Sequence, residues 1–103
     1  MEEETSREPR VTLRYFDGCP HWRLAHERLG KAGLTDLDIR FEQVETQEDA
    51  ERLHFVGSPT ILIDCRDPFD RTEGDFGLSC RVFETPEGLA GSPTVEQLRA
   101  ALS

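Results

Sequence analysis

A strand-like pattern passes directly into a helix-like pattern near the start of this chain, and the join contains a cysteine. Residues 10–16 alternate apolar and polar side chains, which is the period of a β-strand with one buried face. An Asp-Gly pair at 17–18 ends the alternation. Cys19 and Pro20 then begin a helix, where the missing N–H of proline costs nothing. The side chains expected on the buried side of this helix are Trp22, Ala25, His26, Leu29 and Ala32.

Two more strands and a short helix follow before the chain reaches a last strand and a last helix. Thr46 is a natural N-cap for the short helix, and Thr94 with Gln97 resembles a capping box before the final one. A helix separates the first two strands, so these strands are expected to be parallel. Only a loop joins the last two strands, which could therefore pair antiparallel. The expected strands are 10–16, 37–44, 61–63 and 81–84, and the expected helices are 20–32, 47–54 and 94–102.

The length and charge of the chain limit its organisation and its partners. With 103 residues it holds one domain, expected at 10–103 after a flexible acidic tail at 1–9. A net charge of −9 repels phosphate backbones, so nucleic acid is not an expected partner. No apolar run approaches the ~20 residues that span a bilayer, so no membrane partner is expected. The N-terminus lacks a basic start followed by an apolar stretch, which favours a cytoplasmic location.

The three cysteines, Cys19, Cys65 and Cys80, are the most reactive side chains of the sequence. Their odd number argues against a stable disulfide framework in a reducing compartment. No two of them have Cys-x-x-Cys spacing, so we expect neither a metal site nor a cofactor. Free N–H groups and the helix dipole favour an anion at a helix start, so Cys19 is expected to form a nucleophilic thiolate. His21 could add a positive charge or a hydrogen bond.

Two motifs in this order of elements resemble the thioredoxin superfamily over about residues 10–102. The first is Phe-Asp-Gly-Cys-Pro-His-Trp at 16–22, and the second is Val-Gly-Ser-Pro-Thr at 56–60. The resemblance implies an α/β, thioredoxin-like fold of order β-α-β-α-β-β-α, with a four-stranded mixed sheet flanked by helices. It implies a catalytic pair, Cys19 and His21. The substrate-binding residues that it implies are Pro20, Trp22, Ser58, Pro59 and Thr60.

The second motif looks like the loop in which this superfamily has a cis-proline. The resemblance implies a cis Ser58–Pro59 bond, although most bonds before proline are trans. A cis bond there would expose the backbone of Ser58 beside Cys19. An extended peptide or glutathione could then pair with that backbone, strand to strand.

Trp22 stands where dithiol members of the superfamily have the second cysteine of Cys-x-x-Cys. That thiol resolves the mixed disulfide, so its absence points to an atypical monothiol protein acting on protein thiols or disulfides, or on glutathione. Cys65 and Cys80 lie at strand ends far from Cys19 in the expected topology, and could instead be neighbours that form a second thiol site. The loop between them leaves other positions of Cys80 open. Three arginines of this region are expected to be solvated: Arg66, Arg71 and Arg81.

Three functions of different classes fit this sequence. The first is a monothiol oxidoreductase, or a protein that forms mixed disulfides, acting through Cys19. The second is a thiol-based site for a soft ion such as mercury or arsenic, because soft ions select thiolates; two neighbouring cysteines would support it. The third is a redox-inactive binding module, which deep burial of Cys19 would favour. We take the first as the working hypothesis and leave its natural partner, resolving thiol and oligomeric state open.

Overall fold

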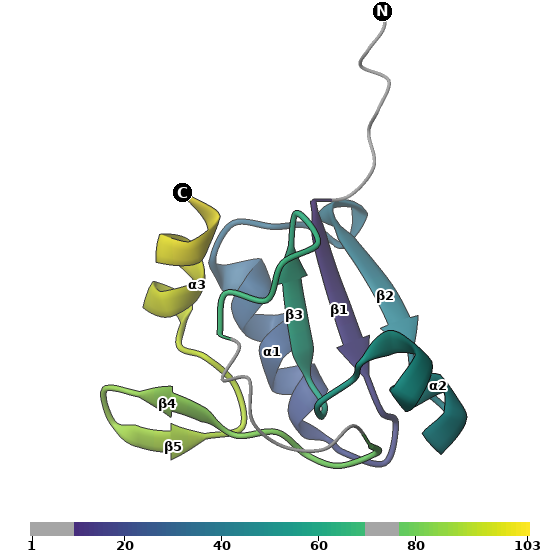
Figure 1. Ribbon diagram of the computed structural model, residues 1–103. Helices are drawn as coiled ribbons and strands as arrows, with labels where there is room; N and C mark the ends of the chain where they lie inside the picture. Colours follow the sequence, from purple (N-terminus) through teal and green to yellow (C-terminus); the bar gives the residue numbers. More distant parts are fainter. Residues whose placement is uncertain (1–9, 70–76) are drawn as a thin grey trace, which may run out of the picture.

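The computed structural model describes residues 10–69 and 77–103 as a mixed α/β domain (Figure 1). The expected acidic tail at 1–9 and the expected solvated Arg71 lie outside the described residues. In chain order the elements are β1 (Val11–Tyr15), α1 (His21–Lys31), the 3-10 turn η2 (Asp36–Asp38), β2 (Ile39–Gln43), α2 (Gln47–Leu53), β3 (Thr60–Ile63), β4 (Phe83–Thr85), β5 (Gly88–Ala90) and α3 (Val95–Leu102).

The main sheet has the strand order β2-β1-β3, with β1 at its centre (Figure 1). β1 runs parallel to β2, as the helix between them predicts, and antiparallel to β3. Leu13 in β1 is paired with Phe41 on one side and with Ile61 on the other. Because β1 and β3 are antiparallel, the residues that follow β1 lie at the same edge as the residues that precede β3. This topology brings the two sequence motifs together.

Local sequence signals set the ends of the helices. Pro20 is the N-cap of α1, and Gly33, with a φ of +113°, follows its C-cap. The side chain of Thr46 accepts a hydrogen bond from the backbone at the start of α2. Thr94 and Gln97 form the predicted capping box of α3. The Thr46 and Thr94 caps satisfy backbone groups that would otherwise lack partners, whereas Pro20 makes no side-chain cap; all three positions confirm the predicted helix starts.

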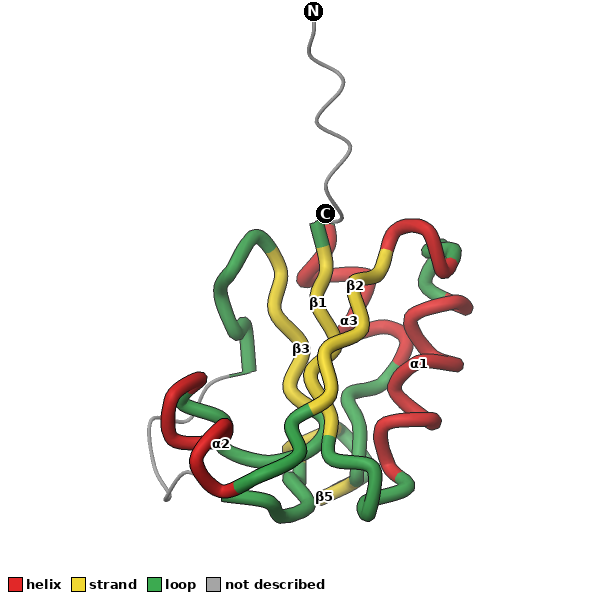
Figure 2. Tube along the Cα trace, turned by 90° about the vertical axis from the view of Figure 1, so that its right-hand side faces the viewer, coloured by secondary structure: helices red, strands yellow, loops and turns green. Residues whose placement is uncertain are grey.

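Helices lie on both sides of the main sheet, with α1 and α3 on one side and α2 on the other (Figure 2). Beneath α2, a small cluster contains Val44, Ala50 and Phe55, all fully buried. The larger cluster is formed by apolar residues of all three sheet strands, α1 and α3. Its buried members are Val11, Leu13, Ala25, Leu29, Ile39, Ile61, Ile63 and Leu98.

Among the described residues, the main sheet has three strands where the sequence predicts four. The sequence pattern pairs residues 81–84 with β3, whereas β4 pairs antiparallel with β5 in a separate hairpin. Gly88, with a φ of +112°, allows the tight connection between these two strands. The second strand begins at Ile39 and not at Leu37, because the turn η2 precedes it and leaves Leu37 89% exposed.

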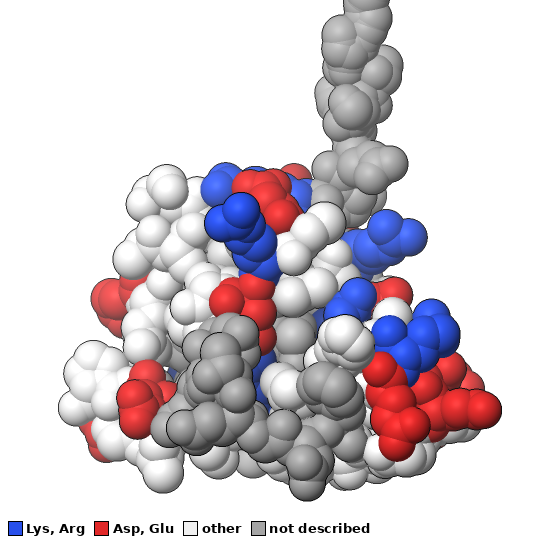
Figure 3. Space-filling view, in the orientation of Figure 1, with Lys and Arg blue, Asp and Glu red and all other residues white. Residues whose placement is uncertain are grey.

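On the face shown in Figure 3, acidic side chains gather at α2, and basic side chains lie beside them. α2 carries Glu48 and Asp49 in its first turn and Arg52 in its last turn. This order places acids at the positive end of the helix dipole and a cation at the negative end, which stabilises the helix. Within the described part of the chain, no helix has the length and apolar character needed to cross a membrane.

Candidate functional site

Cys19 lies between the end of β1 and the first turn of α1. Its backbone N–H donates a hydrogen bond to the carbonyl of Phe16, with an N···O distance of 3.0 Å. A Cβ on Gly18 would lie 2.7 Å from the tip of the Phe16 ring, so a larger residue in this turn would displace that ring. The first turn of α1 has no side-chain cap and no acidic residue. The positive end of the α1 dipole therefore faces Cys19 without an anion of its own helix to neutralise it.

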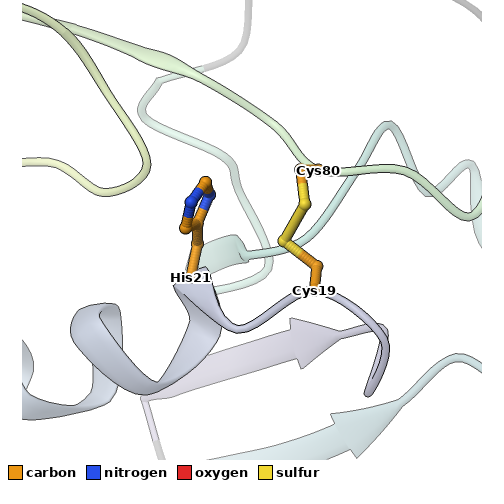
Figure 4. A group of neighbouring side chains, drawn as sticks. All are labelled: Cys19, His21 and Cys80. Carbon is orange, nitrogen blue, oxygen red and sulfur yellow. A yellow bond between two sulfur atoms is a disulfide. The ribbon is translucent and has the colours of Figure 1, made fainter.

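Cys19 and Cys80 form a disulfide, with their Cα atoms 5.7 Å apart (Figure 4). The prediction that Cys65 and Cys80 both lie far from Cys19 is therefore wrong for Cys80. That prediction pairs residues 81–84 with β3, whereas Cys80 forms a parallel bridge with Ser58, just before β3 begins. Cys65 is a free, exposed cysteine. The candidate site therefore contains two sulfur atoms, Cys19 Sγ and Cys80 Sγ.

The Ser58–Pro59 peptide bond is cis, as the second motif implies. Cys19 Sγ lies 3.6 Å from the carbonyl oxygen of Ser58, so the two motifs meet as expected. The backbone of Ser58 is nevertheless not open to a ligand. Its N–H donates to the carbonyl of Ser79 at 2.8 Å, and its carbonyl accepts from the N–H of Arg81 at 2.9 Å. The chain's own segment 79–81 occupies the position that the sequence assigns to a peptide or glutathione.

Two residues hold segment 79–81 against Ser58. Gly57 has a φ of +134°, and a Cβ on it would lie 3.0 Å from the Cβ of Arg81. Arg81 is 7% exposed, so its predicted solvation is wrong. Its guanidinium donates to the Asp67 carboxylate at 2.7 Å and to the Phe69 carbonyl at 2.6 Å. These contacts connect the segment that carries Cys80 to the chain that leaves β3.

His21 is the first residue of α1, and its ring stands beside the disulfide (Figure 4). Its Nδ1 atom is buried and has no hydrogen-bond partner among the described residues. The ring packs against Gly91, where a Cβ would lie 2.5 Å from ring atoms Cγ and Nδ1. The two sulfur atoms and an imidazole nitrogen all lie within 4.8 Å of one another. Cys19, His21 and Cys80 therefore form a cluster of three potential metal ligands.

The other residues of the two motifs stabilise the fold around this cluster. Trp22 stacks on Tyr15, with the ring centroids 4.3 Å apart, and packs against the larger core cluster. Thr60 is buried, and its hydroxyl donates to a backbone carbonyl at 2.7 Å within the loop that precedes β3. Pro59 is fully buried, whereas Pro20 is exposed. Of the five residues that the sequence assigns to substrate binding, Pro20 is exposed, Trp22 is partly buried, and the other three are buried in the described structure.

Cys65 and His26 lie outside the cluster of potential ligands. Cys65 has a φ of +68° and follows Asp64, whose φ is +53°, in the turn after β3. Two successive positive φ values are typical of a type I′ turn. Arg66 is exposed in this turn, as predicted. His26 is partly buried, as the helical pattern predicts, and forms a hydrogen bond of 2.7 Å with Asp36.

The sequence reasoning missed the part of the site that comes from outside the two motifs. Gly57 directly precedes the Ser-Pro pair, and a glycine at such a place signals a close approach of another backbone. This signal could have indicated that a segment lies against Ser58, although not which one. Gly91 gives no comparable signal, since it lies in a stretch that shows only turn residues.

Comparison of the sequence with protein-family models, with curated proteins and with solved structures gives no match. The chemistry of the site must therefore be argued from its own geometry. That geometry combines a buried sulfur at a helix start, a second sulfur bonded to it, and an imidazole beside both.

Proposed function

We propose that this chain is a thioredoxin-like protein that performs thiol–disulfide exchange, with Cys19 and Cys80 as its redox pair. The parallel β1–β2 pair with α1 between its strands, the antiparallel β3 and the cis bond before Pro59 support the thioredoxin-like assignment. The observation that carries the exchange function is the position of Cys19. It lies at a helix start that has no side-chain cap and no acidic residue in its first turn, with a second sulfur and the Ser58 carbonyl beside it.

The two cysteines differ in their access to a partner. Cys19 is 1% exposed, whereas Cys80 is an exposed residue. A partner thiolate therefore attacks Cys80 Sγ, the bond between the two sulfurs breaks, and Cys19 leaves as a thiolate. The positive end of α1 stabilises this leaving thiolate, which speeds the step. A second partner thiolate attacks the mixed disulfide and releases the Cys80 thiolate, so two electrons pass from the partner to the protein.

The reverse direction explains how the protein works with Trp22 at the usual position of the second thiol. The Cys80 thiolate attacks a partner disulfide and forms a mixed disulfide, releasing one partner thiolate. The Cys19 thiolate then attacks Cys80 Sγ, re-forms the internal disulfide and releases the second partner thiolate. Cys80 thus meets the partner and Cys19 is the resolving thiol, the opposite of the order that the sequence pattern suggests.

Access to the disulfide favours a small thiol as the partner. The backbone of Ser58 already pairs with segment 79–81, so an extended peptide has no free strand edge there. Glutathione needs only to reach the exposed residue Cys80. We therefore expect glutathione, or a flexible cysteine on another protein, as the exchange partner.

Trapping of mixed disulfides on single-cysteine variants tests this proposal. Each variant also carries Cys65→Ser, because Cys65 is free and exposed and would otherwise react. The reduced proteins are mixed with oxidised glutathione, quenched with acid and weighed by mass spectrometry. We expect Cys19→Ser to accumulate one glutathione on Cys80, and Cys80→Ser to accumulate it far more slowly on the buried Cys19. Equal rates in the two variants would contradict the assigned order of attack.

Alkylation of the reduced Cys65→Ser protein tests the role of the helix start. The rate at which iodoacetamide modifies Cys19 is followed against pH by mass spectrometry. We expect a midpoint below the ~8.5 of an ordinary cysteine thiol, because the α1 dipole favours the thiolate. A midpoint at or above that value would remove the reason for assigning thiol chemistry to Cys19.

A redox-inactive binding module is the second candidate function, and the burial of Cys19 favours it. The disulfide would then serve only to hold segment 79–81 in place. In that case excess reduced glutathione leaves the disulfide of the folded protein closed and opens it only when denaturant is added. Treatment of the folded, oxidised Cys65→Ser protein with reduced glutathione therefore separates the two candidates.

A further inference from the structure

The cluster of Cys19, His21 and Cys80 contains one group that the proposed exchange reaction does not use. That group is the imidazole of His21. Its Nδ1 atom is buried and unpartnered among the described residues, although a buried polar atom normally has a partner. The imidazole stands beside the two sulfurs (Figure 4), and a nitrogen of the ring lies within 4.8 Å of both. Two sulfur atoms and one nitrogen atom are therefore close enough together to bind the same metal ion.

The spacing of these three atoms suits a thiophilic cation once the two sulfurs are separated. Zinc binds thiolate sulfur at ~2.3 Å and imidazole nitrogen at ~2.0–2.1 Å in tetrahedral geometry, which puts neighbouring ligand atoms ~3.5–3.8 Å apart. The ligand atoms of Cys19, His21 and Cys80 already lie within 4.8 Å. Reduction of the disulfide lets the sulfurs move apart by the short distance that the ion needs. Three protein ligands leave a fourth position for water or an added ligand.

The surroundings of the cluster hold the ligands in place without the disulfide. Cys19 precedes α1 in the chain and His21 is its first residue, so the start of this helix positions both. Cys80 lies between two backbone hydrogen bonds, which join its neighbours Ser79 and Arg81 to Ser58. Gly91 allows the imidazole to stand where it does, because a Cβ there would overlap the ring. None of these contacts involves the sulfur–sulfur bond, so we expect them to hold the three ligands when the disulfide is opened.

We propose that the reduced protein binds one thiophilic d10 cation of the Zn²⁺ class through Cys19 Sγ, Cys80 Sγ and a ring nitrogen of His21. Soft thiolates with imidazole are the ligand set that this class of ion prefers. Cys65, which is exposed in a turn after β3, is not a ligand. The inference requires that the disulfide can be reduced, and it does not depend on exchange with a biological partner.

Binding and release follow from the same two sulfurs. The ion displaces the protons of the two thiols, so binding to a site with both thiols protonated and a neutral imidazole releases two protons. A partner disulfide oxidises the bound thiolates to the Cys19–Cys80 disulfide, is itself reduced to two thiolates, and releases the ion. The oxidised protein has no thiolate ligand to offer at this site. Metal binding and the internal disulfide are therefore mutually exclusive states of the chain.

A competition titration tests the site. The Cys65→Ser protein is reduced, freed of reductant without oxygen, and titrated with Zn²⁺ against a chromophoric chelator. Cd²⁺ is titrated in parallel, because its thiolate charge-transfer absorption reports sulfur ligation directly. We expect one equivalent of each ion per reduced chain, sulfur ligation of Cd²⁺, and no binding to the oxidised chain.

Two variants test the nitrogen ligand, and one matched variant serves as the control. His21→Ala removes the ligand, and Gly91→Ala pushes the ring out of its place. We expect each to weaken Zn²⁺ binding at least about tenfold, since loss of even an outer hydrogen-bond partner of a ligand costs that much. Gly30→Ala is the control, because a Cβ at this α1 position has no atom within 4 Å and should leave affinity unchanged. Circular dichroism and re-formation of the disulfide show that each variant is folded.

The outcomes separate this inference from the proposed function. No Zn²⁺ binding by the reduced chain, equal binding by the oxidised chain, or unchanged affinity in folded His21→Ala would each overturn the site. If glutathione exchange is observed without Zn²⁺ binding, the metal site alone is refuted. If Zn²⁺ binds as described but no exchange occurs, the proposed exchange function fails and the metal site stands.

Discussion

Reduction of the Cys19–Cys80 disulfide should lower the free energy of unfolding by about 4 kcal/mol. The two cysteines are 61 residues apart in the sequence, so the bond closes more than half of the chain into a loop. In the chain-entropy description, a loop of this length removes about 14 cal/mol/K of entropy from the unfolded chain, which is about 4 kcal/mol at 25 °C. A small domain is stable by only about 5–15 kcal/mol, so this is a large share of its stability.

Urea unfolding of the oxidised and reduced protein measures this difference. A domain of this size has a urea dependence of about 2 kcal/mol/M, so the midpoint should fall by about 2 M on reduction. The measurement uses the Cys65→Ser background, in which the disulfide cannot be exchanged with the free, exposed thiol. Cys80→Ser in the same background should unfold near the midpoint of the reduced protein and should not respond to reductant.

Two results would refute this reasoning. A midpoint that does not move on reduction would mean that the bond is not formed in solution, or that its loop closure gives no stability. A reductant response that persists in Cys80→Ser would mean that Cys19 is paired with another thiol. A thiol count of the oxidised protein distinguishes the two meanings of an unmoved midpoint, and only absence of the bond would also remove the redox pair on which the proposed function rests.

Three further predictions concern residues that shape the site and the fold. Gly57→Ala should destabilise the domain by at least about 1–2 kcal/mol in urea unfolding, because the φ of +134° is strained for alanine and the Cβ meets Arg81; an unchanged midpoint would contradict this. Arg81→Met should lower the free energy of unfolding, measured in urea, by about 3 kcal/mol, because it leaves the Asp67 carboxylate, 14% exposed, without its ion pair. Adding Asp67→Asn to the same chain should recover part of this loss. Backbone and hydroxyl hydrogen bonds from Thr35 lower the pKa of Asp38, so the stability they give is present above the unfolded pKa of 3.8 and is lost as pH falls through the folded pKa. Asp38→Asn should therefore be less stable than the native chain at about pH 7, and the difference should shrink as pH falls below the unfolded pKa; an equal loss at neutral and acidic pH would refute the assignment.

Local patterns of the sequence determined the three helices and the three strands of the main sheet, but not η2 or the β4–β5 hairpin. The alternation before Asp17, the helix start at Pro20 and the caps at Thr46 and Thr94 all act over a few residues, so a single sequence contains the whole signal. The helix between the first two strands also required their parallel pairing. From these local rules, and from the likeness of its motifs, the sequence pointed to Cys19, which the structure places in the disulfide and in the cluster of potential ligands.

The position of Cys80 was decided by tertiary structure alone. Residues 64–79 separate β3 from Cys80, and nothing in their sequence pattern fixes the direction in which the chain returns. That direction depends on contacts between residues far apart in sequence: the backbone pairing of Ser58 with segment 79–81, and the ion pair of Arg81 with Asp67. Because such contacts carry no period in the sequence, they could not be predicted from it. The same holds for His21. Its place beside the two sulfurs depends on Gly91, which directly follows β5.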